Sequence, residues 1–206
     1  MQSRVAIGLA VLCLAACASL EYPVSRHGEV ATRVATVAPD PEPARLAHLD
    51  ASQVARGHYL AQIMGCGGCH TDGALVGAPD AARLFAGSSV GIAATDPARD
   101  LRPAVVFPAN LTPDPKTGIG GRSDAQIAAA IRAGWHGEGA GELQIMPWRE
   151  YAILTNEDVA AIVAYLRSIP AIEHPVPGRV ARGTNARAPY LYFGVYRSGP
   201  AVSAGR

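Results

Sequence analysis

The 206-residue chain contains few charged residues and few sulfur-containing residues, and these shortages limit which functions it can have. Charged residues make up 17% of the chain and the formal net charge is +1. The chain therefore lacks the surplus of basic residues that would indicate a nucleic-acid partner. There are four cysteines, three methionines and a single lysine, Lys116. The apolar run at the N-terminus, Val5 to Ala16, is too short to span a bilayer comfortably. Because there are only seven cysteines and methionines in all, the role of each can be considered separately.

The N-terminus has the pattern of an export signal, with a positive charge at Arg4 followed by the apolar run. The run ends in "LAAC", residues 14–17, which resembles the lipobox of bacterial lipoproteins. Cleavage there precedes the cysteine, and several acyl chains on it anchor firmly. We therefore expect a lipoprotein signal peptide over 1–16, a lipidated Cys17, and a lipid-anchored protein on the periplasmic face of a bacterial membrane. The alternative is ordinary cleavage at "ACA", residues 16–18, which gives a soluble periplasmic protein.

The rest of the chain divides into three parts. Residues 17–50 contain alternating prolines, which indicate an extended tether. Residues 51–172 carry the helical patterns of one domain. Residues 173–206 form a tail with "APYLYFGVY", whose alternating aromatics indicate an edge strand, an aromatic wrap or a partner-docking segment. We favour packing of this tail on the domain's own surface.

Three helices can be argued from capping and periodicity. The first is expected over 51–64, with Asp50 or Ser52 as its N-cap. The second follows Ser123, which forms a capping box with Gln126. The third follows Thr155 and ends before Pro170. Its apolar stripe, at i, i+3, i+4 and i+7, consists of Val159, Ile162, Val163 and Leu166. Three helices joined by long loops offer only a thin core, which a large, rigid, apolar cofactor would complete.

Two cysteines remain for chemistry after export. Cys13 lies within the signal and Cys17 would carry lipid, which leaves Cys66 and Cys69 in "IMGCGGCHTDG", residues 63–73. The pattern C-x-x-C-H is the attachment signal of c-type haem. The two thiols would add across the haem vinyl groups, and His70 would be the proximal iron ligand. Export supplies the compartment in which such attachment occurs. We therefore predict one covalently bound haem c.

Two other interpretations of the motif fit less well. A zinc site would need a fourth ligand, and the adjacent Cys69 and His70 cannot easily both reach one tetrahedral metal. A thioredoxin-like dithiol follows a strand and opens a helix. Here a predicted helix precedes the motif and a glycine-rich loop follows it.

A haem iron also needs a ligand on its distal side. Met1 is lost with the signal, and Met64 lies on the attachment side of the haem. Met146, in the loop "LQIMPWREY", is the methionine with the reach to cross the haem, although a buried methionine is commonly core filling. His136 is the alternative distal ligand.

The chain resembles class I c-type cytochromes, and especially the cytochrome subunits of bacterial membrane-associated alcohol, aldehyde and gluconate dehydrogenases. The matching stretches are "ARGHYLAQIMGCGGCHTDG", "NLTPDPKTGIGGRSDAQIAAAIRAG" and "MPWREYAILTNEDVAAIVAYLRSIP", which cover most of 55–170. The resemblance implies a globular all-α haem domain with long haem-wrapping loops. In it Gly57 lets the first helix approach Tyr165 on the last. It also implies haem attachment at Cys66 and Cys69, with His70 as the proximal and Met146 as the distal ligand.

Two features depart from the family. Residues 86–106 match its usual loop poorly, so Pro79 and Pro108 are both candidates for the carbonyl that steadies His70. Family members also often carry three such domains, whereas this chain has one C-x-x-C-H.

Four polar or aromatic residues flank the motifs: Asn110, Thr112, Trp148 and Tyr151. They would either hydrogen-bond the haem propionates or serve as loop caps and half-buried aromatics.

The expected function is electron transfer by a membrane-tethered monohaem carrier that is not itself an enzyme. It would accept electrons from an exported dehydrogenase and pass them to another cytochrome or a terminal oxidase of the respiratory chain. A peroxidase-like enzyme would need an open iron position or a second haem. A gas-sensing module would need a weak or missing distal ligand and an output domain.

Overall fold

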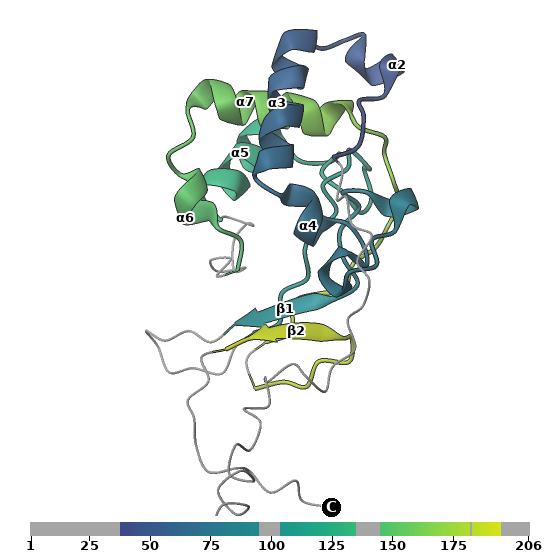
Figure 1. Ribbon diagram of the computed structural model, residues 1–206, viewed down its shortest axis with the longest axis vertical. Coiled ribbons are helices and arrows are strands. Elements are labelled where there is room, and N and C mark those ends of the chain that lie inside the picture. Colours follow the sequence, from purple (N-terminus) through teal and green to yellow (C-terminus); the bar gives the residue numbers. More distant parts are fainter. Residues whose placement is uncertain (1–37, 95–103, 135–144, 182, 195–206) are drawn as a thin grey trace, which may run out of the picture. The chain divides into compact units, whose positions relative to one another are not determined.

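A computed structural model describes residues 38–94, 104–134, 145–181 and 183–194. Cys17, His136 and most of the expected tether lie outside these residues. The described helices and strands are shown in Figure 1 and have the following bounds: α2 Pro43–Leu46, α3 Ala51–Ile63, α4 Cys66–His70, β1 Gly91–Ala94, α5 Asp124–Ala133, α6 Trp148–Tyr151, α7 Asn156–Ser168 and β2 Tyr190–Phe193. Two short 3-10 helices, Ala74–Val76 and Ala81–Arg83, lie between α4 and β1. No helix among the described residues is long and apolar enough to cross a bilayer.

The three predicted helices are confirmed, together with their caps. Asp50 accepts a hydrogen bond from the Gln53 amide at the start of α3, and Ser123 forms its capping box with Gln126 before α5. Thr155 accepts a hydrogen bond from the Asp158 amide at the start of α7. These signals are local, since each cap satisfies amides of the first turn that have no partner within the helix.

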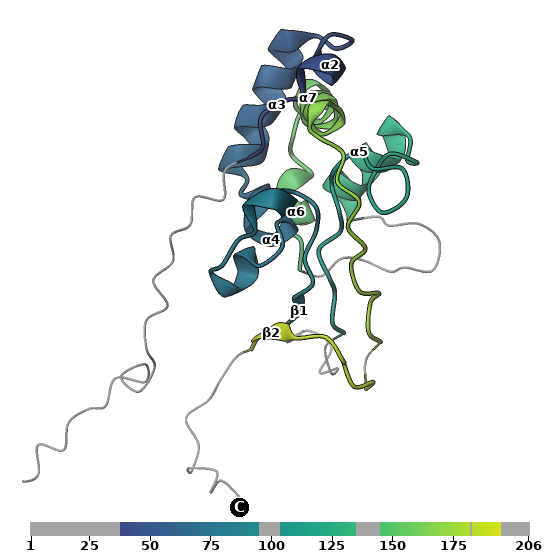
Figure 2. The same ribbon diagram turned by 90° about the vertical axis from the view of Figure 1, so that its right-hand side faces the viewer.

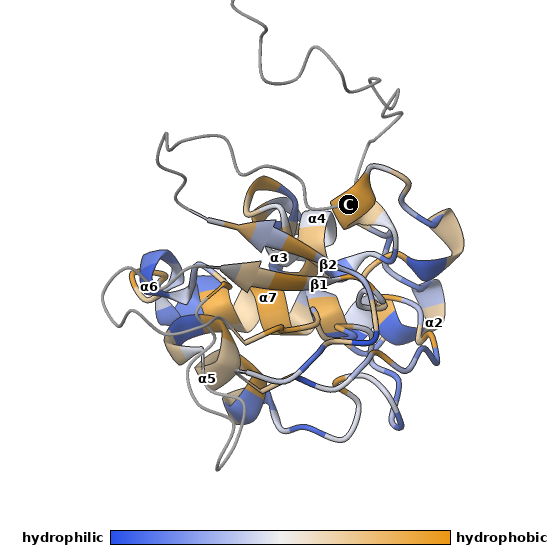
Figure 3. Ribbon diagram, turned by 90° about the horizontal axis from the view of Figure 1, so that it is seen from below, coloured by the Kyte–Doolittle hydropathy of each residue, from blue (hydrophilic) through white to orange (hydrophobic). Residues whose placement is uncertain are grey.

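The first and last of these helices, α3 and α7, pack closely against each other (Figures 1 and 2). A Cβ atom on Gly57 would overlap the carbonyl oxygen of Ala161 and lie 2.7 Å from the Cβ atom of Tyr165. The expected close approach at Gly57 is therefore confirmed. Tyr165 is fully buried, stacks on the ring of His58 and meets the ring of Phe85 edge-on. Figure 3 shows the strongly hydrophobic character of α7, which supplies much of the main core.

The domain is largely helical, as expected, but not all-α, because β1 and β2 form a two-stranded parallel sheet (Figure 1). Gly91 pairs with Tyr190 and the ladder continues to Ala94 and Phe193. Ile92 also forms an antiparallel bridge with Val106 on the other side of β1. The aromatic tail segment is therefore a strand on the domain's own surface, one of the arrangements that its alternation predicts.

The structure also differs from the expected tether at its C-terminal end. Residues 43–46 form α2, with Pro43 in the first turn, where a missing amide proton costs nothing. Ala38 is buried, and the Pro39 carbonyl accepts a 2.8 Å hydrogen bond from the Tyr165 hydroxyl. The Glu42 amide donates to the Ser168 carbonyl at 2.7 Å. Residues 38–50 therefore pack on the domain, which begins earlier in the chain than residue 51.

Candidate functional site

A mainly apolar cavity brings together the residues that the sequence singled out. Cys66, Cys69, His70 and Met146 all border it. Its apolar walls come from β1, from the segment 106–111, from α5 and from α7. The aliphatic and aromatic residues that make these walls include Ile92, Phe107, Leu111, Ile127, Ile131, Ile162 and Leu166. A cavity of this kind, apolar with a few convergent polar groups, is typical of a cofactor site.

The two cysteines reach the cavity from a short helix. Gly65 takes a left-handed conformation, with φ of 68°, and so turns the chain from the end of α3 into α4. Cys66 and Cys69 are three residues apart in α4 and share one side of it. Both are free thiols. Burial raises the pKa of Cys66 to about 11 and also raises the pKa of Cys69. A redox-active dithiol needs a lowered pKa, so this environment disfavours that interpretation of the motif.

His70 follows directly and has a fixed ring orientation. Its Nδ1 atom lies 2.8 Å from the carbonyl oxygen of Ala109. When Nδ1 carries the proton and donates to this oxygen, Nε2 has the lone pair that a metal requires. The carbonyl is that of Ala109, so both proline candidates are wrong. The Pro108 carbonyl instead accepts a hydrogen bond from the Ser88 amide at 3.0 Å.

Met146 borders the cavity two residues before the start of α6. The Trp148 amide donates to the Met146 carbonyl at 2.8 Å, which holds the turn around Pro147. Met64, at the end of α3, borders the same cavity two residues before Cys66. The Tyr151 hydroxyl donates to the Met64 carbonyl at 3.2 Å and so ties α6 to the end of α3. Burial raises the pKa of Tyr151 to about 12.

The four flanking residues separate into two groups. Among the described lining residues are Asn110 and Tyr151, but not Thr112 or Trp148. Thr112 is fully buried and exchanges hydrogen bonds with Asn110 and Ile172, which is the loop-capping role. Trp148 packs over Gly134, where a Cβ atom would lie 2.5 Å from the Trp148 Cδ1 atom.

Sequence reasoning missed Arg122. Among the described lining residues it is the one with a permanent charge. It is exposed, and follows the glycine-rich segment 118–121 directly before the cap residue Ser123. A guanidinium at the rim of an apolar cavity can bind a carboxylate such as a haem propionate. The signal that would have found it is an arginine between a glycine-rich loop and a capping box.

These residues fit a haem c group. Two thiols, an imidazole held by a carbonyl, a thioether and apolar walls can hold such a cofactor, and the rim cation can bind its propionates. Residues 54–170 match the model of the cytochrome c family. The chain belongs to the cytochrome c family, and this membership implies covalently bound haem c.

Curated relatives point to one branch of that family. The chain is 33% identical over 116 residues to the alcohol dehydrogenase (quinone) cytochrome c subunit of Gluconobacter oxydans, covering 56% of this chain and 21% of the relative. It is 32% identical over 125 residues to the fructose dehydrogenase cytochrome subunit of Gluconobacter japonicus, covering 60% and 23%. It is 32% identical over 112 residues to the gluconate 2-dehydrogenase cytochrome c subunit of Pantoea cypripedii, covering 54% and 22%.

The resemblance to dehydrogenase cytochrome subunits is therefore confirmed. The match extends over only about a fifth of the length of each of these three relatives.

Proposed function

We propose that this protein is a monohaem electron carrier. The observation that carries the proposal is that Cys66, Cys69, His70 and Met146 border one apolar cavity. Each residue has a role in it. The two cysteine sulfurs would form thioether bonds to the haem, His70 Nε2 would bind the iron on one side, and the Met146 sulfur would bind it on the other.

The protein contributes position and environment. Haem, when bound, supplies an iron that changes between the ferrous and ferric states without any bond to the protein being made or broken. Ligation by histidine and methionine raises the reduction potential. The apolar walls exclude water, and the Ala109 carbonyl holds the His70 ring in one orientation. Arg122 at the rim would bind a propionate carboxylate.

We further propose that the electron donor is an exported dehydrogenase and that the acceptor is another cytochrome or a terminal oxidase of the respiratory chain. The relatives are cytochrome subunits of alcohol, fructose and gluconate dehydrogenases, which supports a dehydrogenase donor. The segment "LAAC", residues 14–17, supports a lipid anchor at Cys17 on the periplasmic face of the membrane. The alternative, ordinary cleavage after Ala18, gives a soluble periplasmic protein.

Cysteine variants test attachment and anchoring separately. We expect the haem-dependent peroxidase stain of wild-type protein to survive denaturing electrophoresis, and to disappear in the variant that carries Cys66→Ser and Cys69→Ser. Cys17→Ser is the matched control, which should keep the stain but lose partitioning into membranes. If acid–acetone extraction removes all haem from wild-type protein, the haem is not covalent and the proposal fails.

A reduction assay tests the role as a carrier. The purified protein alone should not oxidise alcohols, aldehydes or sugar acids, because the chemistry assigned to it is electron transfer. Adding a quinone-type dehydrogenase with its substrate should reduce the haem, which the visible spectrum reports. Sustained turnover of substrate by the isolated chain would identify an enzyme instead.

A further inference from the structure

We infer that Asn110 is a positioning residue for the proximal ligand, because it clamps the loop carrying Ala109 to the segment that follows α7. The inference rests on the proposed function, in which His70 binds the haem iron. It assigns a role in the site to residues 172–174, which follow α7. The sequence pattern places these residues at the border between domain and tail.

Asn110 is 2% exposed and its amide uses both donors and its acceptor. Nδ2 donates to the Ile172 carbonyl at 2.8 Å and to Thr117 Oγ1 at 3.0 Å. Oδ1 accepts from the Thr112 amide at 2.9 Å and from Thr112 Oγ1 at 2.8 Å. Asn110 follows Ala109 directly in the chain, and the Ala109 carbonyl lies 2.8 Å from His70 Nδ1. The orientation of that carbonyl is therefore tied to the Asn110 side chain.

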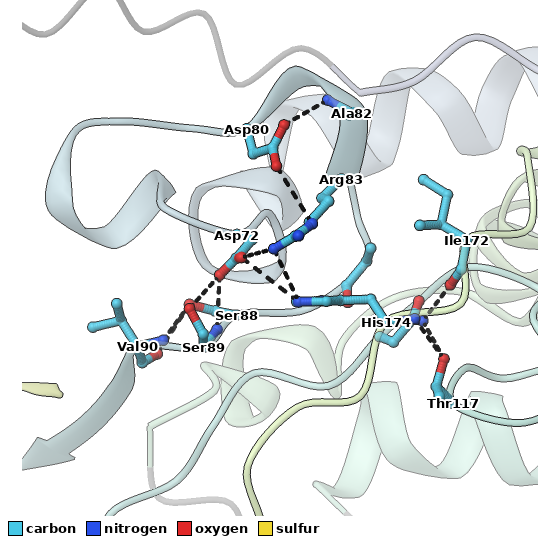
Figure 4. Close-up of polar contacts among 12 residues, drawn as sticks. Asp72, Asp80, Ala82, Arg83, Ser88, Ser89, Val90, Thr117, Ile172 and His174 are labelled. Carbon is cyan, nitrogen blue, oxygen red and sulfur yellow. Dashed lines mark hydrogen bonds and ion pairs between the residues drawn. The ribbon is translucent and has the colours of Figure 1, made fainter. Parts of the chain in front are cut away.

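The segment after α7 also holds a second loop that contacts His70. The His174 amide donates to Thr117 Oγ1 at 2.9 Å, and its ring Nδ1 lies 2.9 Å from the Ala86 carbonyl oxygen. Figure 4 shows the His174 ring reaching toward Asp72 and Arg83, with Thr117 on the opposite side. The next residue after Ala86, Gly87, donates its amide to the His70 carbonyl at 2.8 Å. Residues 172–174 thus join both loops that hold the histidine.

This arrangement has a consequence for the iron. A hydrogen bond from His70 Nδ1 to a carbonyl makes the imidazole a more basic ligand, and a basic ligand favours the ferric state. If Asn110 no longer clamps the loop, the Ala109 carbonyl gains freedom and this hydrogen bond weakens. The reduction potential should then rise, and the Nδ1 proton should exchange faster with water.

The test is Asn110→Ala in the full, haem-bearing chain, with Ser168→Ala as the matched control. Ser168 is fully buried and donates a 2.7 Å hydrogen bond to the Tyr165 carbonyl, but it is absent from the described cavity lining. In Asn110→Ala we expect a higher midpoint potential and about tenfold faster exchange of the His70 Nδ1 proton, measured by NMR in the reduced state. Ser168→Ala should change neither quantity, although it also removes a buried hydrogen bond.

If Asn110→Ala does not fold, Thr117→Val removes the hydroxyl that joins Asn110 to His174 and should shift both readouts in the same directions. Haem-bearing variants with an unchanged or lower potential and an unchanged exchange rate would overturn the inference and leave the proposed function standing. Wild-type protein without covalent haem would overturn both.

Discussion

At the scale of single residues, two side chains that border one cavity differ in what holds them. His70 is oriented by a hydrogen bond to the Ala109 carbonyl, whereas Met146 is positioned by the backbone turn that ends in α6. A histidine ligand needs a fixed ring plane, because one nitrogen must face the metal while the other donates. A thioether has no such requirement and fits by rotating its flexible chain.

The first prediction concerns Met146. In the proposed ligation, replacing it with alanine would remove a soft, neutral ligand that favours the ferrous state, so we expect the reduction potential to fall. The weak near-infrared sulfur-to-iron band should disappear, and carbon monoxide should bind the reduced haem. Spectroscopy and potentiometry measure these changes.

Met64→Ala is the matched control, because Met64 borders the same cavity from the end of α3. It should retain the near-infrared band. An unchanged spectrum and potential in Met146→Ala would place the ligand elsewhere, and His136 is then the first residue to replace.

At the scale of elements, the contact between α3 and α7 depends on the absence of one side chain. Gly57 brings the backbones so close that a methyl group has no room, because the atoms it meets are the Ala161 carbonyl and the Tyr165 Cβ atom. Backbone atoms cannot rotate away as a flexible side chain can. The helices would have to separate to admit even one carbon.

We therefore predict that Gly57→Ala destabilises the fold by about 3 kcal/mol, the upper end of the usual cost of overpacking. The loss should appear as a lower urea midpoint with an unchanged slope. Gly178→Ala serves as the control, since a Cβ atom there has nothing within 4 Å. Equal stability of the two variants would show that the helices adjust at little cost.

The elements differ in how far the sequence predicts them. The long helices were predictable because caps and apolar periodicity are local: Ser123 and Gln126 satisfy each other within one turn. The alternating aromatics indicated β2 as one of three possibilities, but β1 was not predictable, because it is four residues long and its ladder partner begins at Tyr190. The same holds in the site. The C-x-x-C-H spacing identifies His70, but which carbonyl meets its Nδ1 atom depends on the path of a loop with no period.

At the scale of the whole molecule, the described domain extends beyond the helical patterns on both sides. The alternating prolines before α3 predict an extended chain, but an extended chain can also pack on the surface of a domain. The Tyr165 hydroxyl donates a hydrogen bond to the Pro39 carbonyl, and burial raises the pKa of this hydroxyl further above its ordinary value. The segment that begins at residue 38 is thus hydrogen-bonded to a fully buried side chain of the core.

We predict that Tyr165→Phe destabilises the domain by about 1 kcal/mol, the net value of one hydrogen bond. The stacking on His58 and the edge contact with Phe85 should persist, because the ring is retained. Urea unfolding measures the loss, and trypsin should cleave faster after Arg45. Tyr59→Phe, at an exposed site on α3, should change neither result. If both variants behave alike, the segment is held by other contacts.

The pairing of α3 with α7 also bears on how the chain reaches its fold. The hydrogen bond between Arg56 and Asp158 joins residues 102 apart, and the one between Tyr165 and Pro39 joins residues 126 apart. Closing loops of that length costs entropy before any contact is gained, so folding should be slow for a largely helical domain. During synthesis, the apolar face of α3 is complete long before its partner exists. For that interval the growing chain exposes the apolar face of α3 and depends on segments not yet made to cover it.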